Sequence, residues 1–288
     1  MTKQEVLDFL THEFALSNLP ESFQKLREIS NDPHSDIQDV VAVVRKDVEL
    51  AARLLKLANS SLFSRGEHTE TIEQAAQKLG MRRVVESSLA IGLIKEISID
   101  PEVFDTINFW KRSLTIAKIT EDVFELIPHF LKARIEKNLL YTAGLLHDVG
   151  ILAMIQGFSD EMVSVVDYAV AEDLPIYVAE RNRWGFSHQD IGRILFKKWN
   201  LPESLQAAAG YHHNPVDLKR RIYAPLVDII YVADYTYSVR EEMPFRDPCK
   251  PVMYPEVWKR IGIDPTELVE LEDSLVEAKS HAEMLLAS

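Results

Sequence analysis

Apolar residues recur at helical spacing along almost the whole chain, and this pattern restricts the fold more than any other feature. Even the β-branched stretch from Val227 to Val232 follows it, because Leu226, Ile229, Ile230 and Ala233 fall at i, i+3, i+4 and i+7. No segment alternates apolar and polar residues around an Asn-Gly or Asp-Gly turn, as a β-hairpin would. The sequence therefore predicts an all-α protein.

Helix boundaries are marked by capping residues. Thr2-x-x-Glu5, Ser35-x-x-Gln38 and Thr71-x-x-Gln74 are capping-box patterns that predict three helix starts, and Asp47 predicts a fourth. Gly80 follows the apolar stripe that begins near Thr71 and is expected to stop that helix.

Proline-rich punctuation suggests how the helices are grouped. Pro244, Pro248 and Pro251 separate a final helical segment from the rest, and a softer boundary lies at Ile99-Asp100-Pro101. We expect two lobes, an N-terminal helical lobe over residues 1–100 and a central helical bundle over 101–240, followed by a C-terminal helical appendix over 241–288.

Charge and cysteine content exclude several classes of function. The 45 acidic residues outnumber the 32 basic ones, and the densest basic cluster, Lys219-Arg220-Arg221, is short, so no nucleic-acid partner is expected. Cys249 is the only cysteine, which rules out an internal disulfide and a cysteine-based zinc site. No apolar run approaches the ~18 residues that span a bilayer, and the start of the chain is polar. We expect a cytoplasmic protein without membrane contact.

Several polar residues lie on the apolar faces of their helices. His147 follows Leu140, Ala143 and Gly144 at helical spacing, and Asp234 is expected to end the helix that carries Ile230. A single inward histidine is usually a hydrogen-bonded core residue, but unpaired buried polar groups each cost about 1–3 kcal/mol, so six of them must satisfy one another, a metal ion or water. Imidazole and carboxylate groups together suit Fe, Mn, Ni or Zn. The candidate cluster is His147, Asp148, His188, His212, His213 and Asp234.

The segment from Gly144 to Gly150, with its His-Asp pair, resembles the HD superfamily of metal-dependent phosphohydrolases, particularly the HD-GYP branch. That resemblance implies metal ligands at the candidate cluster and a metal-bound hydroxide that attacks a phosphodiester. Three positions depart from it. Arg112 stands where the first histidine ligand is expected, Ile151 replaces a lysine, and Val216-Asp217-Leu218 replaces the Gly-Tyr-Pro loop.

The N-terminal part resembles the HDOD family, an HD-related output domain. The stretch from Asp47 to Asn59-Ser60 matches its signature, and Leu19-Pro20 and the segment from Ile72 to Gly80 fit the same pattern. The resemblance covers roughly residues 15 to 235. It implies a bacterial signalling module with signalling proteins as partners, often without catalysis. Asn59 is also well placed to cap its helix.

Three functions remain open at this point. The first is a non-catalytic signalling module, the second a metal-dependent phosphohydrolase, and the third a sensor that binds a metal or a nucleotide-like or phosphate-like ligand without turnover. Arg112 distinguishes them, because near the cluster it either replaces a metal or recruits an anion. We expect Arg112 to lie beside Asp148, no cofactor to be required, and any divalent metal site to be weak.

Overall fold

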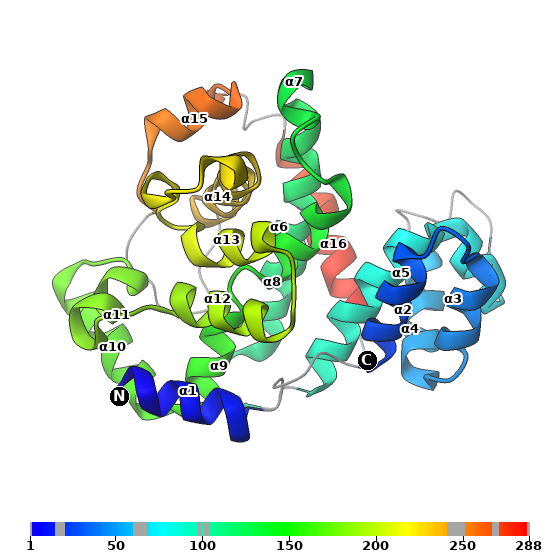
Figure 1. The fold of residues 1–288 in the computed structure, drawn as a ribbon, viewed down its shortest axis with the longest axis horizontal. Coiled ribbons are helices and arrows are strands. Elements are labelled where there is room, and N and C mark those ends of the chain that lie inside the picture. The colour runs from blue at the N-terminus through cyan, green and yellow to red at the C-terminus, as the bar shows by residue number, and fades with distance from the viewer. Residues whose placement is uncertain are drawn as a thin grey trace.

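The computed structural model describes residues 2–14, 21–59, 68–96, 99–100, 104–240, 251–266 and 271–286. Within these ranges every regular element is helical, and no strand is present, so the expected all-α fold is confirmed (Figure 1). Of the positions named above, Leu19, Pro20, Ser60, Pro101, Pro244, Pro248 and Cys249 lie outside the described residues.

A smaller lobe is built on one long helix, α5 (Ile72–Glu96), which packs against α2 (Glu21–Asn31), α3 (Ile37–Val44) and α4 (Val48–Ala58). It lies at the right of Figure 1, in blue and cyan. Asp47 caps α4 as predicted. The cap of α3 is Asp36, paired with Asp39, and not Ser35. The sequence pattern was off by one residue because a carboxylate accepts hydrogen bonds from the same N–H groups as a hydroxyl does.

The start of α5 matches its predicted cap, since Thr71 and Gln74 exchange backbone-to-side-chain hydrogen bonds of 3.2 Å. Its predicted end at Gly80 is confirmed in part. Gly80 has φ 77° and ψ 156°, a non-helical conformation open to glycine, so the first helical run ends there, but a second run begins directly afterwards and continues to Glu96. Gly80 therefore divides α5 at a kink.

The larger lobe surrounds α6 (Thr106–Leu126), which packs against α8 (Leu140–Leu146), α14 (Ala224–Ser238) and α16 (Glu272–Leu286). A second group forms where α12 (His188–Lys198) packs on α9 (Val149–Gly157) and α13 (Glu203–Tyr211). As predicted, the Val227–Val232 stretch is helical, within α14. The remaining elements are α7 (His129–Lys132), α10 (Ser159–Glu172), α11 (Ile176–Trp184), α15 (Pro255–Ile261) and the 3₁₀ turns η1 (Lys137–Leu139), η2 (Pro215–Asp217) and η3 (Arg221–Tyr223).

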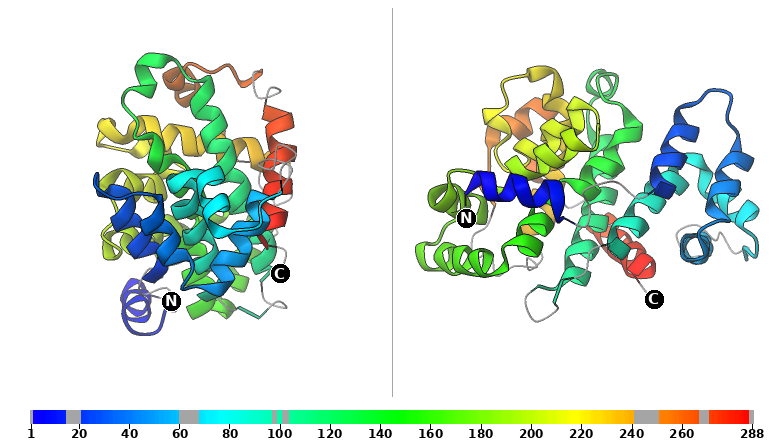
Figure 2. Two further views of the ribbon diagram at one scale, coloured as in Figure 1. Left: turned by 90° about the vertical axis from the view of Figure 1, so that its right-hand side faces the viewer. Right: turned by 60° about the horizontal axis from the view of Figure 1, so that its bottom comes forward.

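Both ends of the chain pack on this larger lobe. Helix α1 (Lys3–His12), opened by the predicted Thr2–Glu5 capping box, lies against α9 and α12 (Figure 2). Phe9 contacts Phe158 edge-on, and Lys198 Nζ donates a 2.7 Å hydrogen bond to the Leu10 carbonyl. Helix α16 lies along α6 and also touches α4 of the smaller lobe. The boundaries between lobes that we expect near residues 100 and 240 remain a prediction.

One bent pair of helical segments has the length and composition of a membrane span. Among the described helices, none alone is long and apolar enough to cross a bilayer. The segments Leu140–Gly157 and Ser159–Glu172 meet the length and composition criteria only together, with a bend of 118° between them.

Candidate functional site

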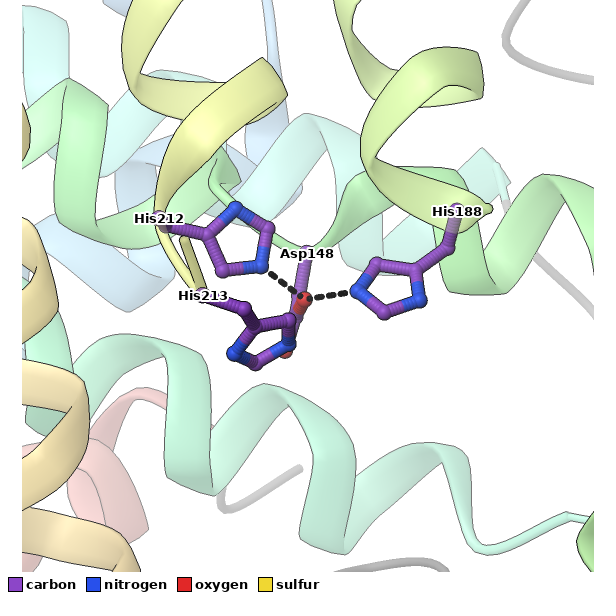
Figure 3. A group of neighbouring side chains, drawn as sticks. All are labelled: Asp148, His188, His212 and His213. Carbon is purple, nitrogen blue, oxygen red and sulfur yellow. Dashed lines mark ion pairs between the residues drawn. The ribbon is translucent and has the colours of Figure 1, made fainter. Parts of the chain in front are cut away.

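The six residues of the candidate cluster converge at the centre of the larger lobe. His147 and Asp148 lie at the junction of α8 and α9, and His188 is the first residue of α12. Ring centroids of His147 and His212 are 5.0 Å apart, and those of His188 and His212 are 5.6 Å apart. Figure 3 shows Asp148 surrounded by three imidazoles. Asp234 also reaches the cluster, although α14 continues four residues beyond it to Ser238, so this residue does not end its helix as expected.

Two glycines that flank the His147-Asp148 pair allow the close helix packing that positions it. A side chain on Gly144 would place its Cβ 2.6 Å from Cα of Ala117, so only glycine lets α8 approach α6 here. A Cβ on Gly150 would overlap the carbonyl oxygen of His188 and lie 2.8 Å from the amide nitrogen of Gly192. The close contact of α9 with α12 thus brings Asp148 beside His188.

The histidines are oriented by hydrogen bonds at one ring nitrogen. Nδ1 of His147 lies 2.7 Å from the Gly144 carbonyl, and Nδ1 of His212 lies 2.9 Å from the Ala209 carbonyl. Nδ1 of His188 lies 2.7 Å from the buried Glu180 carboxylate, which also accepts a hydrogen bond from the His188 amide. Carbonyl and carboxylate oxygens only accept, so each Nδ1 carries a proton and Nε2 faces the cluster.

Glu180 was not anticipated from the sequence, although a signal was present. It follows Ile176 by four residues on α11, and both side chains are buried. The same inward spacing pointed to His188. A carboxylate behind a histidine is the arrangement that fixes ring orientation and tautomer at metal centres.

Asp148 is the hub of the cluster. Its Oδ1 lies 3.1 Å from Nε2 of His212 and 3.4 Å from Nε2 of His188, and all three atoms are buried without a hydrogen-bond partner. Two imidazole lone pairs that face a carboxylate oxygen repel it unless a proton or a cation lies between them.

These atoms form a donor set that fits one divalent cation. One oxygen of Asp148 and one nitrogen each of His188, His212 and His213 all lie within 4.8 Å of one another. Three imidazoles and a carboxylate are ligands that zinc, iron, manganese and nickel accept. Among the described residues, this group is where a metal ion would be held.

Arg112, on α6, occupies the opposite side of Asp148. Its Nη1 is 2.5 Å from Oδ2 of Asp148 and 3.5 Å from Nε2 of His147, and its Nη2 donates to Oδ1 of Asp234. The expected position of Arg112 beside Asp148 is confirmed. The guanidinium is 1% exposed and lies 5.8 Å from the ring centroid of Tyr237.

Electrostatics keep this ion cluster charged. Burial alone would lower the pKa of Arg112, but Asp234 and Asp148 outweigh it, and the pKa is raised. Burial would raise the pKa of Asp148, but His147 and Arg112 hold it well below its usual value. The two carboxylates Asp148 and Asp234 are thus paired with one permanent cation, Arg112.

The imidazoles differ in how readily they take a proton. Burial opposes the charged form of His188, yet the Glu180 carboxylate outweighs burial and raises the pKa of His188. Burial lowers the pKa of His212 despite Asp148, and burial with the neighbouring His212 lowers the pKa of His213 well below its usual value. His212 and His213 therefore stay neutral, as metal ligands require.

The cluster opens toward the surface through a small cavity of about 40 Å³. Tyr177 stacks on His213 with ring centroids 5.0 Å apart. Tyr231 joins the wall to the C-terminal segment, because its hydroxyl donates to the Val252 carbonyl at 2.8 Å and accepts from the Tyr254 amide at 2.9 Å. Val252 therefore lines the cavity beside Tyr231. No sequence signal pointed to these tyrosines, because exposed and cavity-lining aromatic residues share the same helical spacing.

Asn59 is not part of the cluster. It caps α4 in the smaller lobe, where its Nδ2 donates to the carbonyls of Leu55 and Thr69 and its Oδ1 accepts from the Thr69 amide. This supports the capping interpretation of the Asn-Ser signature. Its neighbour Ser60 lies outside the described residues.

Comparison with known proteins places the fold among bacterial proteins. Residues 16–215 match the HDOD domain family. An HDOD domain protein of unknown function from Geobacter sulfurreducens is 25% identical, with a TM-score of 0.79 over 98% of this chain and 97% of that one. An uncharacterized protein of Treponema pallidum (strain Nichols) is 26% identical over 77% of this chain, which spans 42% of the length of that relative.

Two further structures show similarity of fold. A protein from Marinobacter aquaeolei VT8, provisionally named a signal transduction protein, is 23% identical with a TM-score of 0.76 over 99% of this chain, which spans 62% of that one. A protein from Shewanella amazonensis SB2B, provisionally named a phosphohydrolase, is 20% identical with a TM-score of 0.73 over 98% of each chain.

Proposed function

This chain belongs to the HDOD family, and we propose that it is a bacterial regulatory module that acts through protein interaction or ligand sensing without catalysis. The observation that carries this proposal is the pairing of buried Arg112 with both Asp148 and Asp234. The guanidinium supplies the positive charge that these carboxylates need, and a metal ion is not required for that purpose.

A guanidinium cannot replace the chemistry of a metal ion. Hydrolysis of a phosphodiester at neutral pH needs a group that lowers the pKa of bound water and a Lewis acid that takes up developing charge. Arg112 offers only fixed N–H donors, and it engages Oδ2 of Asp148, which leaves Oδ1 alone for a ligand on the histidine side. A two-metal centre bridged by Asp148 has no room on the arginine side.

The small size of the cavity at the cluster also argues against catalysis. The cavity of about 40 Å³ at its mouth is far smaller than the roughly 300–1,000 Å³ of pockets that bind small molecules. Val252, held by Tyr231, is part of the wall of this cavity. A space this small suits a core that holds the lobe together.

We also propose that the cluster is a weak site for one metal ion. Asp148, His188, His212 and His213 would hold a single ion, which would supply Lewis acidity when bound. Glu180 and the Ala209 carbonyl would orient the ligating rings. The charge of Arg112 on the other oxygen of Asp148 weakens the affinity of this set for a cation.

A phosphohydrolase is the alternative function, and one observation favours it. The unpartnered Nε2 atoms of His188 and His212 beside Asp148 Oδ1 are placed as ligands would be. The Shewanella protein carries a phosphohydrolase name, but its similarity extends to the fold alone. The alternative therefore rests on the donor set.

Turnover assays separate the two functions. Untagged protein is assayed with bis-p-nitrophenyl phosphate and with cyclic dinucleotides, each with added manganese or iron. We expect no turnover above buffer in the wild type. Turnover that His147→Ala abolishes and Arg260→His retains would contradict the proposal. Arg260 is a suitable control because it pairs with Asp228 at 2.6 Å, outside the site.

A further inference from the structure

A second cavity lies away from the His-Asp cluster, between the two lobes. Its volume is about 300 Å³, within the range of small-molecule sites and well above that at the cluster. The smaller lobe contributes Phe23 and Arg27 of α2 and Arg82 of α5. The larger lobe contributes Thr142 of α8 and Leu205 of α13. A ligand bound there would touch both lobes.

Most of the charge beside this cavity is already balanced. Arg82 donates to Glu86 at 3.1 Å and to Glu121 at 2.9 Å, and Arg83 donates to Glu121 at 2.9 Å. Two arginines and two glutamates thus compensate one another across α5 and α6. Arg82 also reaches the Lys137 carbonyl at 3.4 Å, so this network joins the lobes directly.

Arg27 is the uncompensated cation of the cavity. Its side chain is half-buried and forms no ion pair or hydrogen bond within the described ranges. A partly desolvated guanidinium without a carboxylate is a ready site for an anion. Because Glu136 stands exposed at the rim, it repels a ligand with two negative charges more strongly than a ligand with one.

The other residues that line the cavity indicate the chemistry of the rest of the ligand. Phe23, Val85 and Leu205 present apolar surface, and Thr142 and Asn200 add hydrogen-bonding groups. Burial raises the pKa of Glu86 to about 7, so near neutral pH its carboxyl carries only part of a negative charge and repels an anion less than a full carboxylate would. An apolar body with one carboxylate meets every feature of this surface.

We propose that this interlobe cavity binds a small organic monocarboxylate, with its carboxylate on Arg27 and its hydrocarbon part against Phe23 and Leu205. Binding there is independent of the His-Asp cluster. Since the walls come from both lobes, an occupied cavity favours one placement of the lobes over others, which gives the protein a route from ligand to signal.

The test uses phenylacetate as the probe, followed by saturation-transfer NMR and calorimetry on the full chain. Phenylacetamide and phenyl phosphate are the neutral and dianionic counterparts. We expect saturable binding of phenylacetate and at least tenfold weaker binding of both counterparts. Arg27→Gln should weaken phenylacetate binding about tenfold, whereas Arg45→Gln, on an exposed arginine paired with Glu73, should not change it.

Two further variants locate the site. Asn31→Trp, at an exposed residue of the cavity rim, should abolish binding by filling the space, with circular dichroism as the check on folding. His188→Ala should leave binding unchanged. The proposal is overturned if phenylacetate fails to bind at about 10 mM, if phenyl phosphate binds more tightly, or if His188→Ala removes binding while Arg27→Gln retains it.

Discussion

Arg112 and Asp148 form a buried ion pair at the centre of the protein, with Nη1 2.5 Å from Oδ2 and both side chains 1% exposed. The pair joins α6 to the junction of α8 and α9, and Asp234 extends it to α14. The candidate site is thus also the point where the main helices of the larger lobe are tied together.

Removing the guanidinium should destabilise the fold strongly. Arg112→Ala leaves Asp148 and Asp234 buried without a cation, and breaking such a pair typically costs about 3–5 kcal/mol. Urea unfolding followed by circular dichroism measures the change. Arg45→Ala is the control, because that exposed arginine should contribute no more than about 1 kcal/mol. Equal effects of the two substitutions would contradict the role of Arg112.

Replacing Arg112 by histidine should restore metal binding in part. A positive charge near 5 Å from a divalent ion weakens binding by several kcal/mol at an effective dielectric near 20, or roughly a hundredfold or more. Arg112→His removes that charge at neutral pH and adds a ligand. Manganese and zinc titrations by calorimetry should show tighter binding than the wild type, and His188→Ala in the same background should remove the gain. Unchanged affinity would show that Arg112 does not govern the site.

Gly150 should tolerate no side chain. A Cβ there overlaps the His188 carbonyl, so Gly150→Ala forces α9 away from α12 and should cost about 3 kcal/mol. Gly192→Ala is a matched control on the same contact. Its Cβ would come no closer to another atom than 3.4 Å, at Cβ of Ala209, so its cost should stay below about 1 kcal/mol. Thermal and urea unfolding of both variants provide the comparison. Similar stabilities would show that the two helices do not need this close contact.

The free energy of unfolding should depend on pH through Glu86. Burial raises its pKa to about 7 from the ordinary value of 4.5, so the folded protein holds a proton that the unfolded chain releases between these values. The contribution of Glu86 is therefore fully present below pH 4.5 and is lost as the pH rises toward 7, by about 3 kcal/mol. The unfolding free energies of the wild type and of Glu86→Gln are measured from pH 4.5 to 8. The value for the wild type minus the value for the variant should fall by that amount as the pH rises. A difference that is flat over this range would contradict the raised pKa.

Much of the site could be predicted from the sequence because helical spacing reports which face of a helix is buried. His147, His188 and Asp234 share inward faces, so their convergence could be predicted. The resemblance to the HD superfamily indicated Arg112 beside Asp148, whereas its second partner, Asp234, emerged only from the structure. Spacing does not report what a buried face packs against. For that reason the position of α1 on the larger lobe, the role of Glu180 behind His188 and the interlobe cavity beside Arg27 emerged only from the structure.

The central claim is that Arg112 takes the place of a metal ion at Asp148, and the metal content of untagged protein tests it most directly. Protein purified without chelators is analysed by plasma mass spectrometry, and crystals of the same material are measured at the absorption edges of manganese, iron, nickel and zinc. We expect metal far below stoichiometry and no anomalous signal beside Asp148. A stoichiometric ion bound through Asp148 with His188, His212 or His213 would contradict this expectation and favour the phosphohydrolase function.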